Sequence, residues 1–233
     1  MSQLKGLKVA TPEYDDAIPS TGEKVKLKPF RVADEKVLLM ASNSEDTTQM
    51  ANAINQVVKN CVVRSSNADL SYFDLEYLFV KLRSVSIGEV AKFGYKCVSC
   101  QTVNEVEIDI SKVKVEGIEG HERNVKITDN LMFGMKYPNA ETIMKYDNED
   151  VGAVLMLIVE CVEKVYTGED VIEVTEAEKE DLLEIVENLT SNQYQGLSNF
   201  LETMPKLKEE TSFVCESCEK ENKVVMEGMR SFF

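Results

Sequence analysis

The sequence is poor in the residues on which many active sites depend. It contains one histidine, His121, and no tryptophan among 233 residues. His121 stands in a polar stretch, residues 120–123, where we expect an exposed loop residue rather than a catalytic base. The chain has no Gly-x-Ser-x-Gly elbow, no Walker A loop and no Rossmann glycine pattern. These absences predict a protein that is not an enzyme.

Long apolar runs are also missing. The longest, residues 151–159, contains Gly152 and is followed by Glu160. It is far shorter than the roughly 20 residues that a membrane-spanning helix needs. Residues 1–5 lack the apolar core of a signal peptide. We therefore expect no membrane insertion, no secretion and a reducing cytosolic compartment.

Basic residues are scarce in one part of the chain. The net charge is −15, and residues 116–212 contain 22 acidic and 8 basic side chains. Such a surface repels nucleic acid and anionic membranes. A solvated acidic face is the simpler interpretation, and a surface for a basic protein partner is the alternative.

Cysteine is the residue type whose pattern points to chemistry. Four of the six cysteines form two C-x-x-C pairs, whereas Cys61 and Cys161 stand in amphipathic apolar segments and are expected to be buried thiols. The two pairs share a frame, because residues 95–106 read YKCVSCQTVNEV and residues 213–224 read FVCESCEKENKV. Each frame has an aromatic residue, two cysteines, an asparagine and a valine at the same spacing. This repetition predicts two copies of one strand–turn–strand unit.

Two such turns supply the four thiolates of a tetrahedral zinc site. We therefore predict that Cys97, Cys100, Cys215 and Cys218 bind one structural zinc ion, with no position left for substrate or water. An iron–sulfur cluster also takes four cysteines and remains an alternative. Disulfides would need an oxidising compartment, and a thioredoxin-like motif would place one pair at a helix start.

The spacing of the pairs determines the predicted domain organisation. The 114 residues between Cys100 and Cys215 are far more than a zinc ribbon contains between its knuckles. We predict an α+β fold with an extended arm (1–30), a helical region (31–90), a ribbon split into two halves (91–115 and 213–233) and an acidic, mostly helical insertion (116–212).

Periodicity and capping residues predict the elements inside these regions. The expected helices are 34–41, 46–63, 71–88, 140–146, 149–165, 175–189 and 190–204. The expected strands are 90–95, 103–110 and 125–135, together with a hairpin around residues 165–172 and short pieces beside Cys215 and Cys218. Thr175 and Glu178 have the spacing of a capping box.

Taken in order, several motifs resemble a known family. They are residues 29–30, 34–39, Cys61, 75–88, 95–100, 137–138, 200–207, 213–218 and 232–233. This order is similar to that of the baseplate hub assembly proteins of T-even-like tailed bacteriophages, from about residue 29 to the end. The resemblance implies a virus-encoded protein that acts in the host cytoplasm to build the central hub of a contractile-tail baseplate.

Three functions follow from these observations. The first is a chaperone-like assembly factor that binds baseplate hub proteins, and the second is a permanent subunit of the virion baseplate. The third, which the acidic charge disfavours, is a zinc-ribbon adaptor for nucleic acid.

Phe232 and Phe233 are candidate partner anchors, although they would equally close the protein's own core. Arg83 is a further candidate contact, for which a helix C-terminus is the simpler interpretation.

Overall fold

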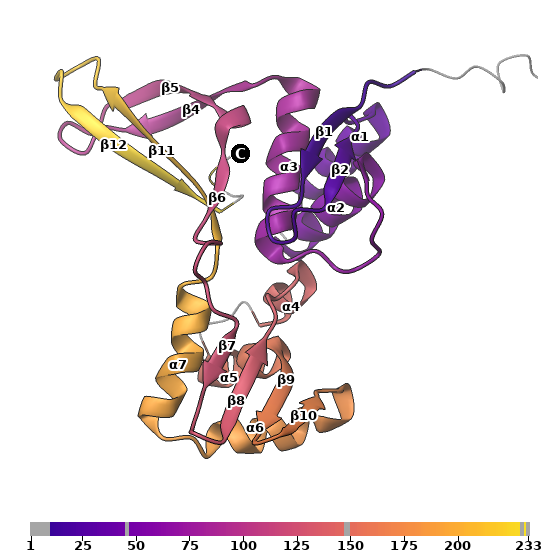
Figure 1. Cartoon of the computed structure of the whole chain (residues 1–233). Helices are drawn as coiled ribbons and strands as arrows, with labels where there is room; N and C mark the ends of the chain where they lie inside the picture. Colours follow the sequence, from indigo (N-terminus) through magenta and orange to yellow (C-terminus); the bar gives the residue numbers. More distant parts are fainter. Residues whose placement is uncertain (1–9, 45–46, 147–149, 229–230, 232–233) are drawn as a thin grey trace, which may run out of the picture. The chain divides into compact units, whose positions relative to one another are not determined.

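The computed structural model describes residues 10–44, 47–146, 150–228 and 231 (Figure 1). The chain contains both helices and strands, in groups rather than in strict alternation, which agrees with the mixed α+β class. The chain divides into two compact units. Unit 1 comprises residues 1–67, 77–113 and 209–233, and unit 2 comprises residues 68–76 and 114–208. Within the described residues, no helix is both long and apolar enough to cross a membrane.

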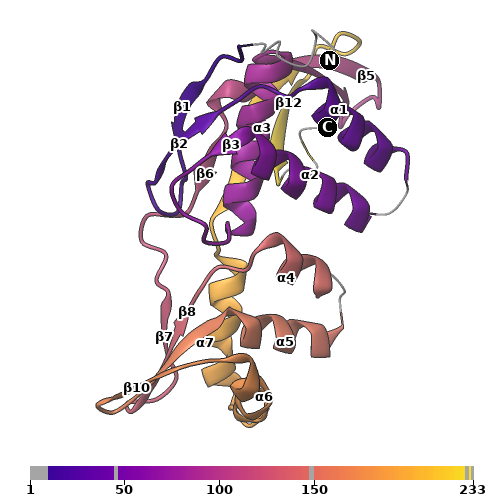
Figure 2. The same cartoon turned by 90° about the vertical axis from the view of Figure 1, so that its right-hand side faces the viewer.

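The N-terminal part of unit 1 is a small sheet with helices. Strand β2 (Lys24–Leu27) pairs antiparallel with β1 (Tyr14–Ala17) on one side and β3 (Val62–Val63) on the other (Figure 2). Strand β2 alternates exposed and buried residues, so Val25 and Leu27 face the core. Part of the predicted arm is therefore a hairpin with an inward apolar face.

Three helices follow the hairpin. They are α1 (Val32–Ser42), α2 (Thr47–Cys61) and α3 (Tyr72–Ile87). Helix α2 buries Ile54, Val57 and Cys61, the stripe that the spacing predicts. Helix α3 starts where Ser71 accepts the Asp74 N–H at 3.3 Å, and it ends before Gly88, whose φ of 146° favours glycine.

Asp34 connects α1 to the end of α2 through a buried carboxylate. Its oxygens accept hydrogen bonds from the Arg31 N–H at 3.0 Å, the Arg31 Nε at 2.9 Å and the Asn60 amide at 3.2 Å. The Cys61 thiol lies 3.7 Å from the same carboxylate. Burial raises the pKa of Asp34, but the hydrogen bonds from Arg31 and Asn60 outweigh it, and the net pKa is below the ordinary value.

We expect Asp34→Asn to lower the free energy of unfolding by about 1–2 kcal/mol at pH 7, because the ionised carboxylate is what Arg31 and Asn60 bind. A lowered pKa stabilises the fold above the unfolded value of about 4, and this contribution is lost as the pH falls through the folded pKa. The free energies of unfolding in urea of variant and wild type should therefore begin to approach each other at about pH 4 and meet below the folded pKa of Asp34. The exposed neighbour Glu35, changed to Gln, is the control. A difference that stays constant with pH would contradict this account.

Unit 2 is built on a four-stranded antiparallel sheet. Its order is β10 (Asp170–Glu173), β9 (Val162–Thr167), β8 (Leu131–Met135) and β7 (Asn124–Lys126). The helices are α4 (Ala140–Lys145), α5 (Val151–Cys161), α6 (Lys179–Glu187) and α7 (Ser191–Glu202). The sequence-based description of this region as mostly helical understates its sheet. Residues 125–135 are a hairpin rather than one strand, because polar Thr128–Asn130 form the turn.

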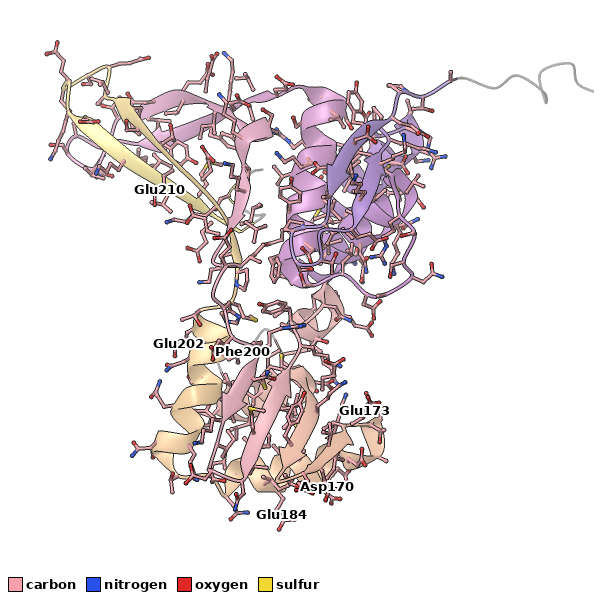
Figure 3. The ribbon with its side chains drawn as sticks, in the orientation of Figure 1. Asp170, Glu173, Glu184, Phe200, Glu202 and Glu210 are labelled. Carbon is pink, nitrogen blue, oxygen red and sulfur yellow. The ribbon has the colours of Figure 1, made fainter. Side chains whose placement is uncertain are left out.

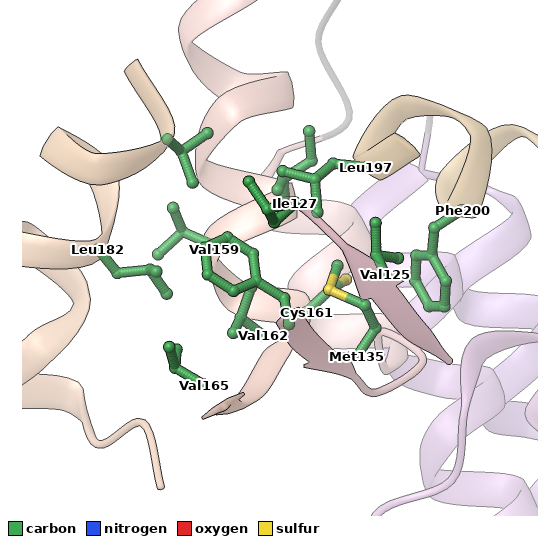
Figure 4. Packing of buried hydrophobic residues seen from close by; sticks show 13 residues of the cluster. Val125, Ile127, Met135, Val159, Cys161, Val162, Val165, Leu182, Leu197 and Phe200 are labelled. Carbon is green, nitrogen blue, oxygen red and sulfur yellow. The ribbon is translucent and has the colours of Figure 1, made fainter. Parts of the chain in front are cut away.

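The core of unit 2 lies between this sheet and its helices. Phe133 and Val159 are fully buried there, and Val125, Leu182 and Leu197 join them from three other elements (Figure 4). Gly196 allows α7 to approach the sheet, because a Cβ at this position would lie 3.0 Å from the Val125 Cγ1. The Thr175–Glu178 capping box is present, as predicted. Hydrophobic burial from helices and sheet together therefore stabilises this unit.

The two ends of the inserted segment pair with each other. Strand β6 (Lys114–Glu116) is antiparallel to the start of β11 (Lys206–Val214), and Lys208 forms an ion pair with Glu116 at 3.3 Å. The sequence indicated strand character only from Phe213, because residues 206–212 show no clear alternation of apolar and polar residues. The structure therefore extends this strand by seven residues towards the N-terminus.

Candidate metal centre

Each C-x-x-C pair lies in a tight turn between two antiparallel strands of unit 1. The first turn joins β4 (Val90–Lys96) to β5 (Val103–Asp109), and the second joins β11 to β12 (Glu221–Glu227) (Figure 1). In the first, the Gln101 N–H donates to the Cys97 carbonyl at 3.0 Å, and the Cys97 N–H donates to the Thr102 carbonyl at 2.9 Å. We call residues 97–102 and 215–220 the two knuckles.

The second knuckle repeats this geometry. The Glu219 N–H donates to the Cys215 carbonyl, and the Cys215 N–H donates to the Lys220 carbonyl, both at 2.9 Å. Gln101 and Glu219 have φ values of 63° and 58°, a left-handed conformation that is unfavourable for residues with a Cβ. The tight turn requires this conformation, because it returns the chain to the second strand while both thiols point to one side.

The four thiols of the two knuckles lie close together in one cluster. All four Sγ atoms lie within 4.8 Å of one another, and the pairs Cys97–Cys218 and Cys100–Cys215 are each 3.6 Å apart. These distances exceed the roughly 2.05 Å of a disulfide bond. Ligands about 2.3 Å from a tetrahedral zinc ion would be separated by about 3.8 Å, which is close to the observed spacing. The cluster therefore has the size and donor set of a site for one thiophilic ion.

The thiols differ in how readily they lose a proton. Backbone N–H groups of Cys100 and Ser99 lower the pKa of Cys97 to about 6, and the Thr102 hydroxyl lowers that of Cys100. The Lys220 N–H lowers the pKa of Cys218, but the neighbouring thiol of Cys100 and burial raise it to about 12. Negative charge therefore builds up in the cluster as protons leave, and a bound cation would offset it.

The other two cysteines lie apart from this cluster. Cys61 and Cys161 are buried, as expected of small apolar residues. Burial raises the pKa of the Cys61 thiol to about 11 and that of Cys161 to about 12, so both stay protonated at neutral pH. Each is free of a disulfide bond and takes part in packing.

The candidate partner residues fall in different places. Arg83 is half-buried on α3, and burial lowers the pKa of its guanidinium. The neighbouring Ser86 hydroxyl accepts the Phe30 N–H at 2.9 Å, so this helix end binds another part of the same unit. Phe232 and Phe233 lie outside the described residues. The roles of all three in partner binding stay predictions.

His121 is not the exposed loop residue that the sequence suggested. It is half-buried, with its Nδ1 2.9 Å from the Tyr137 hydroxyl and its Nε2 3.2 Å from the Phe200 carbonyl. Its ring also packs against both aromatic rings, with centroid distances of 5.5 and 5.0 Å. The prediction was wrong because these partners are 16 and 79 residues away in the chain, where local polarity gives no signal.

We expect His121→Ala to lower the free energy of unfolding of unit 2 by about 1–3 kcal/mol, because Tyr137 and the Phe200 carbonyl lose a partner and the rings lose packing. Thermal unfolding would measure the loss. The exposed neighbour Glu122, changed to Ala, should stay within about 0.5 kcal/mol of the wild type. Equal stability of the two variants would contradict a structural role for His121.

Comparison with known proteins gives one match. No curated protein and no solved structure is significantly similar to the chain. A family model described as "T4 bacteriophage base plate protein" matches residues 10–233, which include both knuckles, all of unit 2 and unit 1 from residue 10 onward. This range covers nearly the whole chain and agrees with the resemblance drawn from the motifs. The chain therefore belongs to the family of T4 bacteriophage base plate proteins.

Proposed function

We propose that this protein is a non-enzymatic, chaperone-like assembly factor for the central hub of a contractile-tail phage baseplate, and that it binds one structural zinc ion. The observation that carries the proposal is the closed set of four cysteine sulfurs in a member of the base plate family. Four protein ligands complete a tetrahedral zinc shell and leave no open position, which is typical of structural rather than catalytic zinc.

The geometry favours a single zinc ion over an iron–sulfur cluster. In a multi-iron cluster the cysteines bind different irons, so their sulfurs lie farther apart than around one ion. Here all four lie within 4.8 Å. The N–H groups of the turns can donate to the sulfurs and offset part of their charge, as Ser99 does to Cys97 at 3.4 Å. Zinc would stabilise unit 1 by joining segments more than 100 residues apart.

The acidic surface supports a role in binding other proteins. Asp170 and Glu173 on β10 and Glu184 on α6 are exposed, and Figure 3 labels their carboxylates on unit 2. Two β-branched residues of the edge strand β10, Val171 and Ile172, are also exposed, by 55% and 46%. Acidic and apolar side chains on one element suit a basic hub protein better than nucleic acid. The adaptor function is therefore not favoured, and binding of DNA at low salt would revive it.

Quantitative mass spectrometry distinguishes an assembly factor from a permanent subunit. An assembly factor acting in the host cytoplasm should be abundant in infected-cell lysates and far below stoichiometric in purified virions. Affinity capture from the same lysates should recover hub proteins with the wild type, and less of them with Cys97→Ser. Stoichiometric presence in virions would contradict the first function and support the second, a permanent subunit, which fits the family description equally well.

A further inference from the structure

The two knuckles are related by an internal symmetry that extends beyond the cysteines. An offset of 118 residues superimposes Cys97 on Cys215 and Asn104 on Asn222. The same offset relates the paired sulfurs, the two positive φ values and the backbone hydrogen bonds within each turn. Tyr95 and Phe213, which occupy equivalent positions, stack on each other with centroids 6.4 Å apart and planes 27° apart. The two hairpins therefore face each other as pseudo-equivalent halves.

Two buried asparagines join these halves in a reciprocal manner. The Asn222 Oδ1 accepts the Val98 N–H at 3.0 Å, and the Asn104 Oδ1 accepts the Glu216 N–H at 2.9 Å. Both N–H groups belong to the residue that follows the first cysteine of the opposite knuckle. Asn104 and Asn222 are 2% and 3% exposed. Each asparagine thus holds the other knuckle directly beside a cysteine.

The other end of each amide binds the asparagine's own knuckle. The Asn104 Nδ2 donates to the Thr102 carbonyl at 2.9 Å, and the Asn222 Nδ2 donates to the Lys220 carbonyl at 2.8 Å. A carboxamide donates and accepts at the same time without charge. Aspartate in this place would lack the donor and add charge beside the thiolates, and an apolar residue would remove the acceptor of the Val98 or Glu216 N–H.

We propose that Asn104 and Asn222 are positioning residues that hold the two knuckles together before metal binds, so that the four-cysteine cage is preformed. Such a pair is needed because 114 residues separate Cys100 from Cys215, so the encounter of the two knuckles is entropically unfavourable. A metal ion alone would have to bring both halves together. This proposal adds a structural detail to the proposed zinc function. It rests on zinc binding only for the predicted effect on metal affinity.

Cobalt(II) titration of the full chain tests the effect on metal affinity. Cobalt reports a tetrahedral four-thiolate shell through its visible absorption. We expect Asn104→Ala and Asn222→Ala each to weaken cobalt binding by about 10–100-fold, the usual effect of removing a residue that supports metal ligands. The two losses should be similar, because the contacts are equivalent. Asn60→Ala removes an asparagine hydrogen bond elsewhere in unit 1 and should leave the affinity unchanged.

Amide hydrogen exchange of the metal-free protein tests the positioning itself. The wild type should protect the Val98 and Glu216 amides without metal. Asn104→Ala should expose Glu216 and spare Val98, and Asn222→Ala should do the reverse. General unfolding would not produce this crossed pattern. Asn104→Asp keeps the accepting oxygen, so it should restore protection at Glu216 while losing the bond to the Thr102 carbonyl.

The outcomes separate this proposal from the zinc function. Wild-type affinity in both alanine variants, or unprotected Val98 and Glu216 amides in the metal-free wild type, would overturn the positioning role. If the wild type binds no cobalt but the two alanine variants show the crossed exchange pattern, the metal function is overturned and the asparagine pair stays supported.

Discussion

Replacing Cys97 by serine is expected to abolish stoichiometric zinc binding and to destabilise unit 1 by about 4 kcal/mol at a free zinc concentration 1,000 times the dissociation constant. The physical reason is that zinc binds the folded cluster of four sulfurs and has no comparable site in the unfolded chain. In a protein of this size the loss corresponds to a decrease of roughly 10 °C in melting temperature. Elemental analysis and thermal unfolding of the purified protein measure both effects.

Removing the metal with a chelator tests the predicted contribution of zinc to stability in a second way. Excess chelator with a thiol reductant should lower the melting temperature of the wild type to that of Cys97→Ser and leave the variant unchanged. Cys161→Ala is the matched control, because Cys161 belongs to the core of unit 2 and lies apart from the cluster, so its zinc content should stay at one. A wild type that is purified without chelator and contains no metal would refute the zinc centre.

Truncating Phe133 to alanine is expected to lower the free energy of unfolding of unit 2 by about 3–5 kcal/mol. Phe133, on β8, is fully buried in the unit 2 core, so the variant loses apolar burial and leaves a cavity. Urea unfolding followed by circular dichroism measures the loss. Val171→Ala on the exposed edge strand is the control and should change stability by less than about 0.5 kcal/mol.

The same variant tests whether the two units are separable. The zinc ligands belong to unit 1 and Phe133 belongs to unit 2. Phe133→Ala should therefore keep one zinc ion and a normal cobalt spectrum at urea concentrations that unfold unit 2. Loss of metal in parallel with the unfolding of unit 2 would mean that the two units unfold as one cooperative system.

Elements with a strong local signal were predictable. The C-x-x-C spacing identified the four residues that the structure brings together, and repeated frames indicated two copies of one turn. Capping residues located the starts of three helical segments, because an N-cap depends on residues within one helical turn. These segments are α3, the turn that leads into α6, and α7. The predicted C-terminal ends of two helices were less accurate. Strands β3 and β9 follow α2 and α5 without a break, so no loop residue marks where each helix ends.

The sequence by itself determined the mixed fold class, the cysteine cluster, the acidic charge of the inserted segment and the resemblance to the base plate family. These properties depend on residue type and short spacing. Only the tertiary structure decided the burial of Asp34, the ring contacts of His121, the sheet of unit 2 and the reciprocal asparagines. The partners of His121 are 16 and 79 residues away, and the bonds of the asparagines to the opposite knuckle span more than 100 residues, so packing selects these contacts and no local pattern reveals them.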